Sequence, residues 1–233
     1  MTTEQLAVVQ GWDDTKDALV RWRRRPFAVL RPWALGSLAV AVVLLAATWV
    51  VATVSRGDAF MADFPGLWRH ADVGDFGFVL YRNGLVLALH AMACVAGFIA
   101  GSSLPQVAAG YSGIWRRIHD RAGPLAIAFV ISATLFSLIT QAYALGGGAA
   151  DLSAALHISP FLLILALLPH ALPELFALFL PLAAWTIASR RGEWQELLAA
   201  TFATVAISVP LLILAAAIET WITPHVLIAL ARG

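Results

Sequence analysis

The sequence predicts an all-α, polytopic membrane helical bundle. Hydrophobic residues make up 61% of the chain and charged residues only 12%, whereas soluble domains carry roughly 25% charge. Most uncharged runs are long enough for a helix to cross the hydrocarbon core, which takes about 20 residues. The period-two alternation of a membrane β-barrel is missing from stretches such as 39–51 and 211–218. Helices are expected because every backbone polar group in lipid must be paired within its own segment. The uncharged runs are 32–55, 83–115, 122–150, 152–173, 175–189 and 197–218.

An amphipathic segment precedes the first of these runs. Large side chains recur along one helix face, and arginines gather at the end of the segment. We therefore expect residues 1–31 to form a cytoplasmic amphipathic helix on the anionic leaflet, followed by a transmembrane helical domain at 32–233. A solvated helix packed on the protein explains the pattern equally well. The recurring residues are Val8, Trp12, Thr15, Leu19 and Trp22.

Arginine placement predicts the orientation, because cytoplasmic flanks hold an excess of Arg and Lys. The N-terminal arginines place the N-terminus inside, and the acidic loop at 55–82 is then external. The next arginine cluster, Arg116 to Arg121, falls in the following loop, which is internal. Expected spans up to this point cover about 33–54, 83–103 and 123–145.

The stretch from Leu152 to Ser189 is too long for one span. Its 38 residues would extend roughly 57 Å as a helix. Pro169 and Pro173 favour a break, since proline removes a backbone donor. Two full crossings, giving six spans in all, are the alternative, but they would leave Arg190 outside. We therefore expect a re-entrant half-helix and five full spans. The remaining predicted segments are the half-helix at 155–168, a span at 171–189 and a last span at 197–221.

Titratable groups inside apolar spans are costly and suggest function. His170 and Glu174 are four residues apart, so they share one helix face within reach of each other. Three interpretations stay open: a structural clamp for backbone opened by the prolines, a partner or substrate contact, and a metal or proton site. The last would need His90 or Glu219 to join from other helices. For His90 we expect a neutral histidine bonded between helices, and for Glu219 an interfacial carboxylate.

Other patterns limit the function. Gly97 and Gly101 form a G-x-x-x-G, which lets two helices approach closely. Signatures of zinc proteases, phosphate-binding loops and nucleophile elbows are absent from the sequence. We expect no catalytic residue, no metal and no cofactor. The net charge of +1 and the lack of a long basic stripe argue against a nucleic-acid partner.

Two motifs carry a resemblance to a known family. Residues Pro169–Ala177 read P-H-A-L-P-E-L-F-A and resemble the P-H-G-x-x-E-L-x-A signature of the stage II sporulation protein M family. Residues Ala217–Pro224 resemble that family's L-I-E-x-F-I-T-P ending. With Asn83 and the two glycines, the similarity covers about residues 76–225, although Ala171 replaces the signature's glycine. The candidate functional residues are therefore Pro169, His170, Pro173, Glu174, Glu219 and Pro224, with Asn83 and His90 as secondary candidates.

The resemblance implies a multi-pass protein of the bacterial cell membrane without catalysis. It implies a scaffold that positions membrane protein partners, which in spore formers form a peptidoglycan-degrading engulfment complex. A homo-oligomer is left open. The alternative function is the permease subunit of an ATP-driven exporter, suggested by the amphipathic N-terminal helix and the number of spans.

Overall fold

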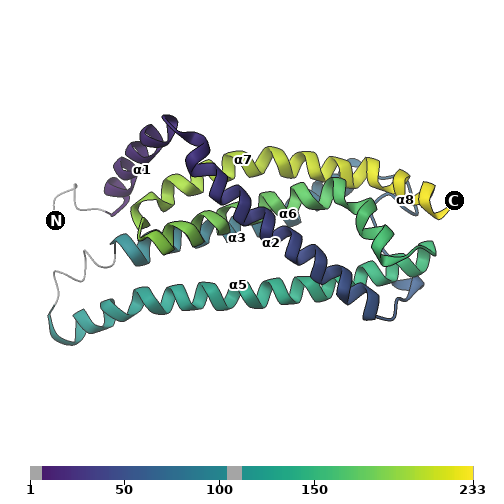
Figure 1. Ribbon diagram of the computed structural model, residues 1–233, viewed down its shortest axis with the longest axis horizontal. Coiled ribbons are helices and arrows are strands. Elements are labelled where there is room, and N and C mark those ends of the chain that lie inside the picture. Colours follow the sequence, from purple (N-terminus) through teal and green to yellow (C-terminus); the bar gives the residue numbers. More distant parts are fainter. Residues whose placement is uncertain (1–6, 104–111, 233) are drawn as a thin grey trace. The chain divides into compact units, whose positions relative to one another are not determined.

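The computed structural model describes residues 7–103 and 112–232, and the described residues fold into helices with no strand among them (Figure 1). Short 3₁₀ turns occur at Ala59–Met61 and Trp194–Glu196, and π-helical turns at Ile99–Ser103 and Ile218–Ile222. The α-helices are α1 (Ala7–Arg23), α2 (Pro26–Val54), α3 (Val73–Phe98), α5 (Gly113–Leu156), α6 (Pro160–Arg191), α7 (Leu197–Ala217) and α8 (Thr223–Ala231).

Five helical segments in the described part of the chain are long and apolar enough to cross a membrane. The last of them joins α7 to α8 through the π-helical turn. The prediction of an all-α membrane bundle is therefore confirmed. The five segments are Pro26–Val54, Val73–Gly101, Ile127–Leu156, Pro160–Arg191 and Trp194–Ala231.

The predicted position of the helix break is wrong. α6 continues through Pro169 and Pro173, so the expected half-helix and the span after it form one helix. The break lies earlier, at residues 157–159, where His157 adopts a positive φ of 55°. α5 runs through the three glycines at 146–148 and ends at Leu156, beyond the expected end of this span at about residue 145. Prolines are tolerated in such helices because neighbouring groups re-satisfy the freed carbonyls.

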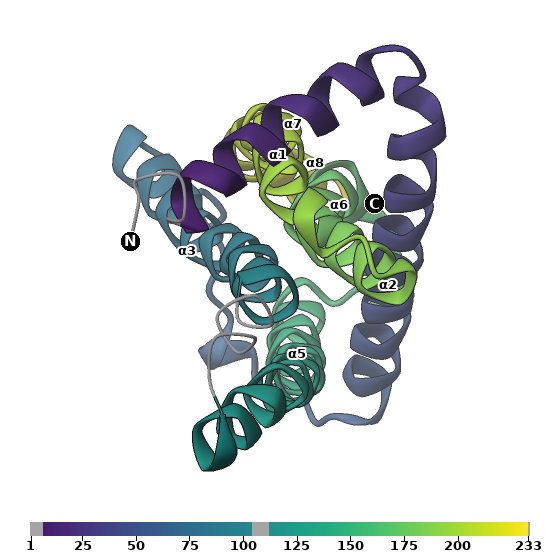
Figure 2. The same cartoon turned by 90° about the vertical axis from the view of Figure 1, so that its left-hand side faces the viewer.

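The N-terminal helix is a separate element. α1 ends at Arg23, and the chain bends sharply before α2 begins at Pro26 (Figures 1 and 2). Proline suits the first turn of a helix, where its missing N–H would have no partner. The helix expected over residues 1–31 thus ends eight residues early, and its first six residues lie outside the described residues. A cytoplasmic surface position for it stays a prediction.

The chain divides into two compact units, and each long helix contributes to both. In the first unit, α1 lies across the beginning of α7 (Figure 2). A Cβ atom on Gly11 would lie 2.7 Å from the end of the Leu198 side chain and 2.9 Å from the ring of Phe98, so these side chains would have to shift. Arg21 donates to Glu196 at 2.7 Å. The first unit comprises Met1–Ser37, Leu87–Thr134 and Leu178–Ser208.

The glycine pair in α3 and the turn after it meets tryptophan rings. A Cβ atom on Gly97 would lie 2.6 Å from Nε1 of Trp185 and 2.8 Å from Leu197. A Cβ atom on Gly101 would clash with the ring of Trp194. Within this unit, the G-x-x-x-G therefore receives bulky side chains of the following helices.

Gly97→Ala is expected to lower the thermal stability of the detergent-solubilised protein. Overpacking costs about 1–3 kcal/mol, which exceeds the gain of about 0.5–1 kcal/mol from replacing a helical glycine. Gly84→Ala is the matched control, because Gly84 lies in the same helix with nothing within 4 Å of its added Cβ. Fluorescence-detected thermal unfolding measures both. Equal melting temperatures for the two variants would contradict the assigned packing.

The second unit has its own apolar core, formed by α2, α5, α6, α8 and the loop after α2. A Cβ atom on Gly57 would clash with the carbonyl oxygen of Ala150, so the chain after α2 passes directly against α5. The Asp58 N–H donates to Asp151 Oδ1 at 2.8 Å beside this approach. The unit comprises Leu38–Val86, Leu135–Ala177 and Val209–Gly233. Its buried core residues are Ala52, Leu67, Ala149, Leu152, Leu156, Leu163, Ile164, Ala166 and Leu227.

Candidate functional site

A cavity of about 360 Å³ lies within the second unit. α2, α3, α5, α6 and the π-helical turn before α8 all line it, together with residues 63–65 of the loop after α2. Most of the lining is apolar and includes Leu45, Phe64, Phe78 and Leu152. A small cluster of polar and charged residues interrupts this apolar lining. The polar or charged lining residues are Thr48, Asp63, Arg82, His170, Glu174 and Glu219.

The helical spacing of His170 and Glu174 brings both to the cavity, but it does not make them a pair. Nδ1 of His170 lies 2.9 Å from Oγ1 of Thr223. The Thr223 hydroxyl itself donates to the carbonyl of Ile218 at 3.1 Å. Because the hydroxyl proton is used in this bond, the hydroxyl oxygen accepts a hydrogen bond from the Nδ1–H of His170. In the neutral ring this leaves Nε2 as an acceptor. This bond joins His170 to the C-terminal motif, and a clamp on the proline backbone stays a prediction.

A local sequence feature explains the π-helical turn that holds Glu219. Pro224 has no backbone N–H, so it cannot continue the regular hydrogen-bond pattern. In the turn just before this proline, the Thr223 N–H donates to the carbonyl of Ile218, five residues back. Wide turns of this kind occur frequently at functional sites. The turn places Glu219 on the cavity wall, where it is only 7% exposed. The expectation of an interfacial carboxylate is therefore wrong.

Charges gather around the two glutamates. The carboxyl groups of Glu174 and Glu219 lie close enough to interact, and Arg82 attracts both. Asn83, which is 4% exposed, lies beside Glu174. Its amide nitrogen lacks a well-formed hydrogen bond among the described residues. Three elements thus bring a guanidinium, an amide and two carboxyl groups together in apolar surroundings, where charges must be paired to be stable.

The remaining candidates lie elsewhere. In the first unit, the ring centroids of His90 and Phe179 are 5.6 Å apart. Nδ1 of His90 lies 2.7 Å from the carbonyl oxygen of Leu178. This is the helix-to-helix hydrogen bond expected of a neutral histidine. Pro169 is exposed and Pro173 half-buried, and neither lines the cavity. Among the described residues no group of three or more His, Cys, Asp or Glu side chains could hold a metal ion.

Sequence reasoning missed three polar residues of the cavity. Arg82 was counted as a loop charge, although it lies inside α3. A charged residue within an apolar helix was the signal that could have identified it. Asp63 comes from the loop after α2, and Thr48 from an otherwise apolar face of α2. Neither has a sequence signal, because their place at the cavity depends on how the helices pack.

A comparison with protein families gives a match over residues 122–224, to the model described as stage II sporulation protein M. The match supports the resemblance to this family over less than half of the chain. Together with the five long apolar helices, the match indicates a multi-pass membrane protein. Both motifs lie within the match, whereas Asn83, Gly97 and Gly101 lie before it. No curated protein and no solved structure matches the chain.

The two motifs that carry the resemblance meet in space in this chain. His170 of the first motif is bonded to Thr223 of the second, and Glu174 faces Glu219 across the cavity. Ala171, which stands where the signature has glycine, also lines the cavity.

Thr223→Val is expected to destabilise the protein by about 1–3 kcal/mol, because the buried N–H of His170 loses its acceptor. Thr186→Val is the control, since that hydroxyl donates only to the Leu182 carbonyl of its own helix, at 2.8 Å. Thermal unfolding in detergent measures both variants. If Thr223→Val is as stable as the control, the bond between the two motifs does not hold the site together.

Proposed function

We propose that this protein is a scaffold of the bacterial cell membrane that positions partner proteins and performs no catalysis of its own. The observation that supports the proposal is the loop at residues 55–72, between α2 and α3. It lies outside the segments long and apolar enough to span the membrane, yet it presents large apolar side chains. Phe60 is 98% exposed, Met61 72% and Trp68 60%.

Polar contacts hold this loop in one conformation. Asp58 begins the 3₁₀ turn and accepts from the Phe60 N–H at 3.0 Å. Nε1 of Trp68 donates to the carbonyl of Ala62 at 3.3 Å. Together with the bond from the Asp58 N–H to Asp151, these contacts hold the backbone at Phe60 and the ring of Trp68. Rigid aromatic side chains are typical of protein-binding surfaces, because they bury large areas at low entropic cost.

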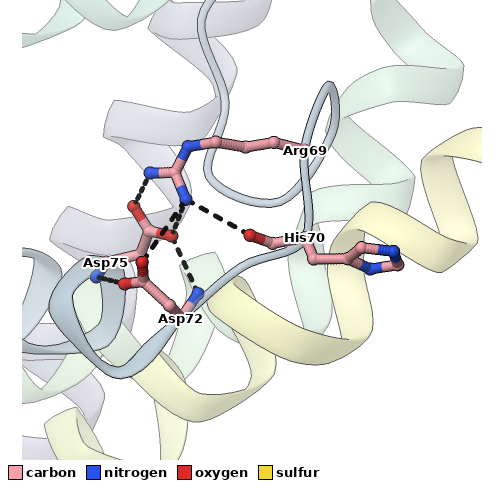
Figure 3. Close-up of polar contacts among 4 residues, drawn as sticks. All are labelled: Arg69, His70, Asp72 and Asp75. Carbon is pink, nitrogen blue, oxygen red and sulfur yellow. Dashed lines mark hydrogen bonds and ion pairs between the residues drawn. The ribbon is translucent and has the colours of Figure 1, made fainter.

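The end of the loop is fixed by a charged cluster, shown in Figure 3. Arg69 forms a two-pronged ion pair with Asp75 at the start of α3, with one bond of 2.8 Å. Asp72 and Asp75 cap each other, because each backbone N–H donates to the other's carboxylate at 3.0 Å. The hydrogen bond and charge of Asp75 raise the pKa of the Arg69 guanidinium. Such bidentate pairing adds geometric specificity.

Arginine positions support an orientation with the N-terminus in the cytoplasm. With five crossings, the basic start of α5 and the basic end of α6 both fall on the same side as the N-terminus. This orientation needs no re-entrant segment, because α6 begins on the opposite side and ends at Arg191. The loop at 55–72 is then external and accessible to partners with domains outside the membrane.

Cysteine labelling in a Cys94→Ala background tests this orientation. An impermeant maleimide added to intact cells is expected to label Phe60→Cys directly, because the exposed loop faces out. Arg191→Cys is expected to react only after permeabilisation. Labelling of position 191 from outside the cell would contradict the proposed topology.

Partner capture tests the scaffold role. We expect the triple variant Phe60→Ser, Met61→Ser, Trp68→Ser to lose crosslinked membrane proteins by about tenfold, as truncation of aromatic anchors does. The readout is in-cell crosslinking followed by mass spectrometry. Phe136→Ala with Ile139→Ala is the control, since these exposed positions lie within a span on α5. Undiminished capture by the loop variant, at wild-type abundance and melting temperature, would exclude this loop as the docking surface.

The second candidate is the permease subunit of an ATP-driven exporter. The cavity favours it, because a site for a transported molecule needs polar groups inside the spanning helices. Copurification of a nucleotide-binding subunit, with ATP hydrolysis that depends on the presence of this chain, would select this role over the scaffold.

A further inference from the structure

We propose that the cavity of the second unit binds an organic ammonium cation with an apolar body. The inference is independent of the scaffold role, because it concerns the interior of the helical bundle. The cavity's volume of about 360 Å³ falls within the range of small-molecule sites, roughly 300–1,000 Å³. Its composition, apolar walls with a few converging polar groups, is also typical of such sites.

The charged groups that line the cavity favour a ligand with a positive charge. Three carboxyl groups, those of Asp63, Glu174 and Glu219, face one guanidinium, that of Arg82. Arg82 attracts both glutamates and cannot neutralise all the carboxylates. Asp63 is exposed on its loop and is also near Arg69, which is engaged by Asp75. Two buried carboxyl groups beside one guanidinium leave the second carboxyl group to be balanced either by its own proton or by a bound cation, because an unpaired charge is costly in apolar surroundings.

An unsatisfied hydroxyl group independently indicates a ligand. Thr48 lines the cavity and is only 5% exposed. Its Oγ1 has no hydrogen-bond partner among the described residues. A buried polar atom without a partner costs about 1–3 kcal/mol, and an N–H of a bound ligand would satisfy it.

The apolar walls fit the body of such a ligand. Phe64 and Phe78 line the cavity from the loop and from α3, and aromatic faces attract cations by about 0.5–2 kcal/mol. Leu45, Leu152 and Ile164 offer only hydrocarbon surface. A bare metal ion would leave most of this surface without contact, whereas an amine with a hydrocarbon body covers both parts of the site.

Equilibrium dialysis with the full chain in detergent tests the proposal, using 2-phenylethylammonium and 2-phenylethanol as probes. The two share one apolar body and differ in charge. The ammonium is expected to bind about tenfold more tightly, because hydrogen bonds to charged groups contribute about 1.5–3 kcal/mol. Equal affinities for the two probes would overturn the proposal.

Substitutions of cavity residues test whether the probes bind in the cavity. Glu174→Gln combined with Glu219→Gln is expected to remove the preference for the ammonium while leaving binding of the alcohol unchanged. Glu193→Gln is the matched control, since this exposed glutamate lies in the first unit. Should the double variant fail to fold, Thr48→Val keeps all charges and is expected to weaken the ammonium about threefold to tenfold. Unchanged affinity in Thr48→Val and in every folded glutamate variant would overturn the site.

The same assay distinguishes two sources of the cation. Displacement of the probe by phosphatidylethanolamine but not by phosphatidylglycerol would assign the ammonium to an aminolipid headgroup. Retention of the probe in the presence of both lipids would assign it to a free amine. Either result supports a cation site, whereas displacement by phosphatidylglycerol alone would contradict its sign.

Discussion

A backbone N–H or C=O group without a partner costs several kcal/mol in hydrocarbon, and most of this chain is apolar enough to lie there. This constraint explains why the described residues fold into long helices. It also explains the irregular turn before α8. Just before Pro224, the Ile218 carbonyl accepts from both the backbone and the hydroxyl of Thr223. That hydroxyl is in turn positioned to accept from His170.

The family's two motifs thus depend on each other. The second motif shapes the turn that places Glu219 on the cavity wall, and the first supplies His170 and Glu174 from α6. A polar cluster in an apolar bundle is expensive to maintain. Arg82 lowers that cost by attracting both glutamates. Apolar residues of similar volume often replace such buried charged groups without loss of stability.

Two surfaces with different chemistry therefore belong to the second unit. The loop at 55–72 presents exposed aromatic side chains and suits a protein partner, while the cavity presents carboxyl groups and suits a small cation. Phe64 belongs to both regions, because it lies in the loop and lines the cavity. The centroid of its ring lies 6.2 Å from that of His170. A partner that moves the loop would consequently act on the cavity lining as well.

The sequence by itself determined the fold class, the number of long apolar helices and the two motifs, because hydropathy and local spacing are properties of a continuous segment. It misplaced the break near α6, since the cost of a proline depends on neighbours that can satisfy the freed carbonyl. It placed His170 and Glu174 on one helix face but could not assign Thr223 to the histidine, 53 residues away. Packing between helices determines that Glu219 is buried. It also determines that Thr48, Asp63 and Arg82 line the cavity. Only the tertiary structure brings these residues to one cavity, because contacts between distant segments leave no periodic pattern in the sequence.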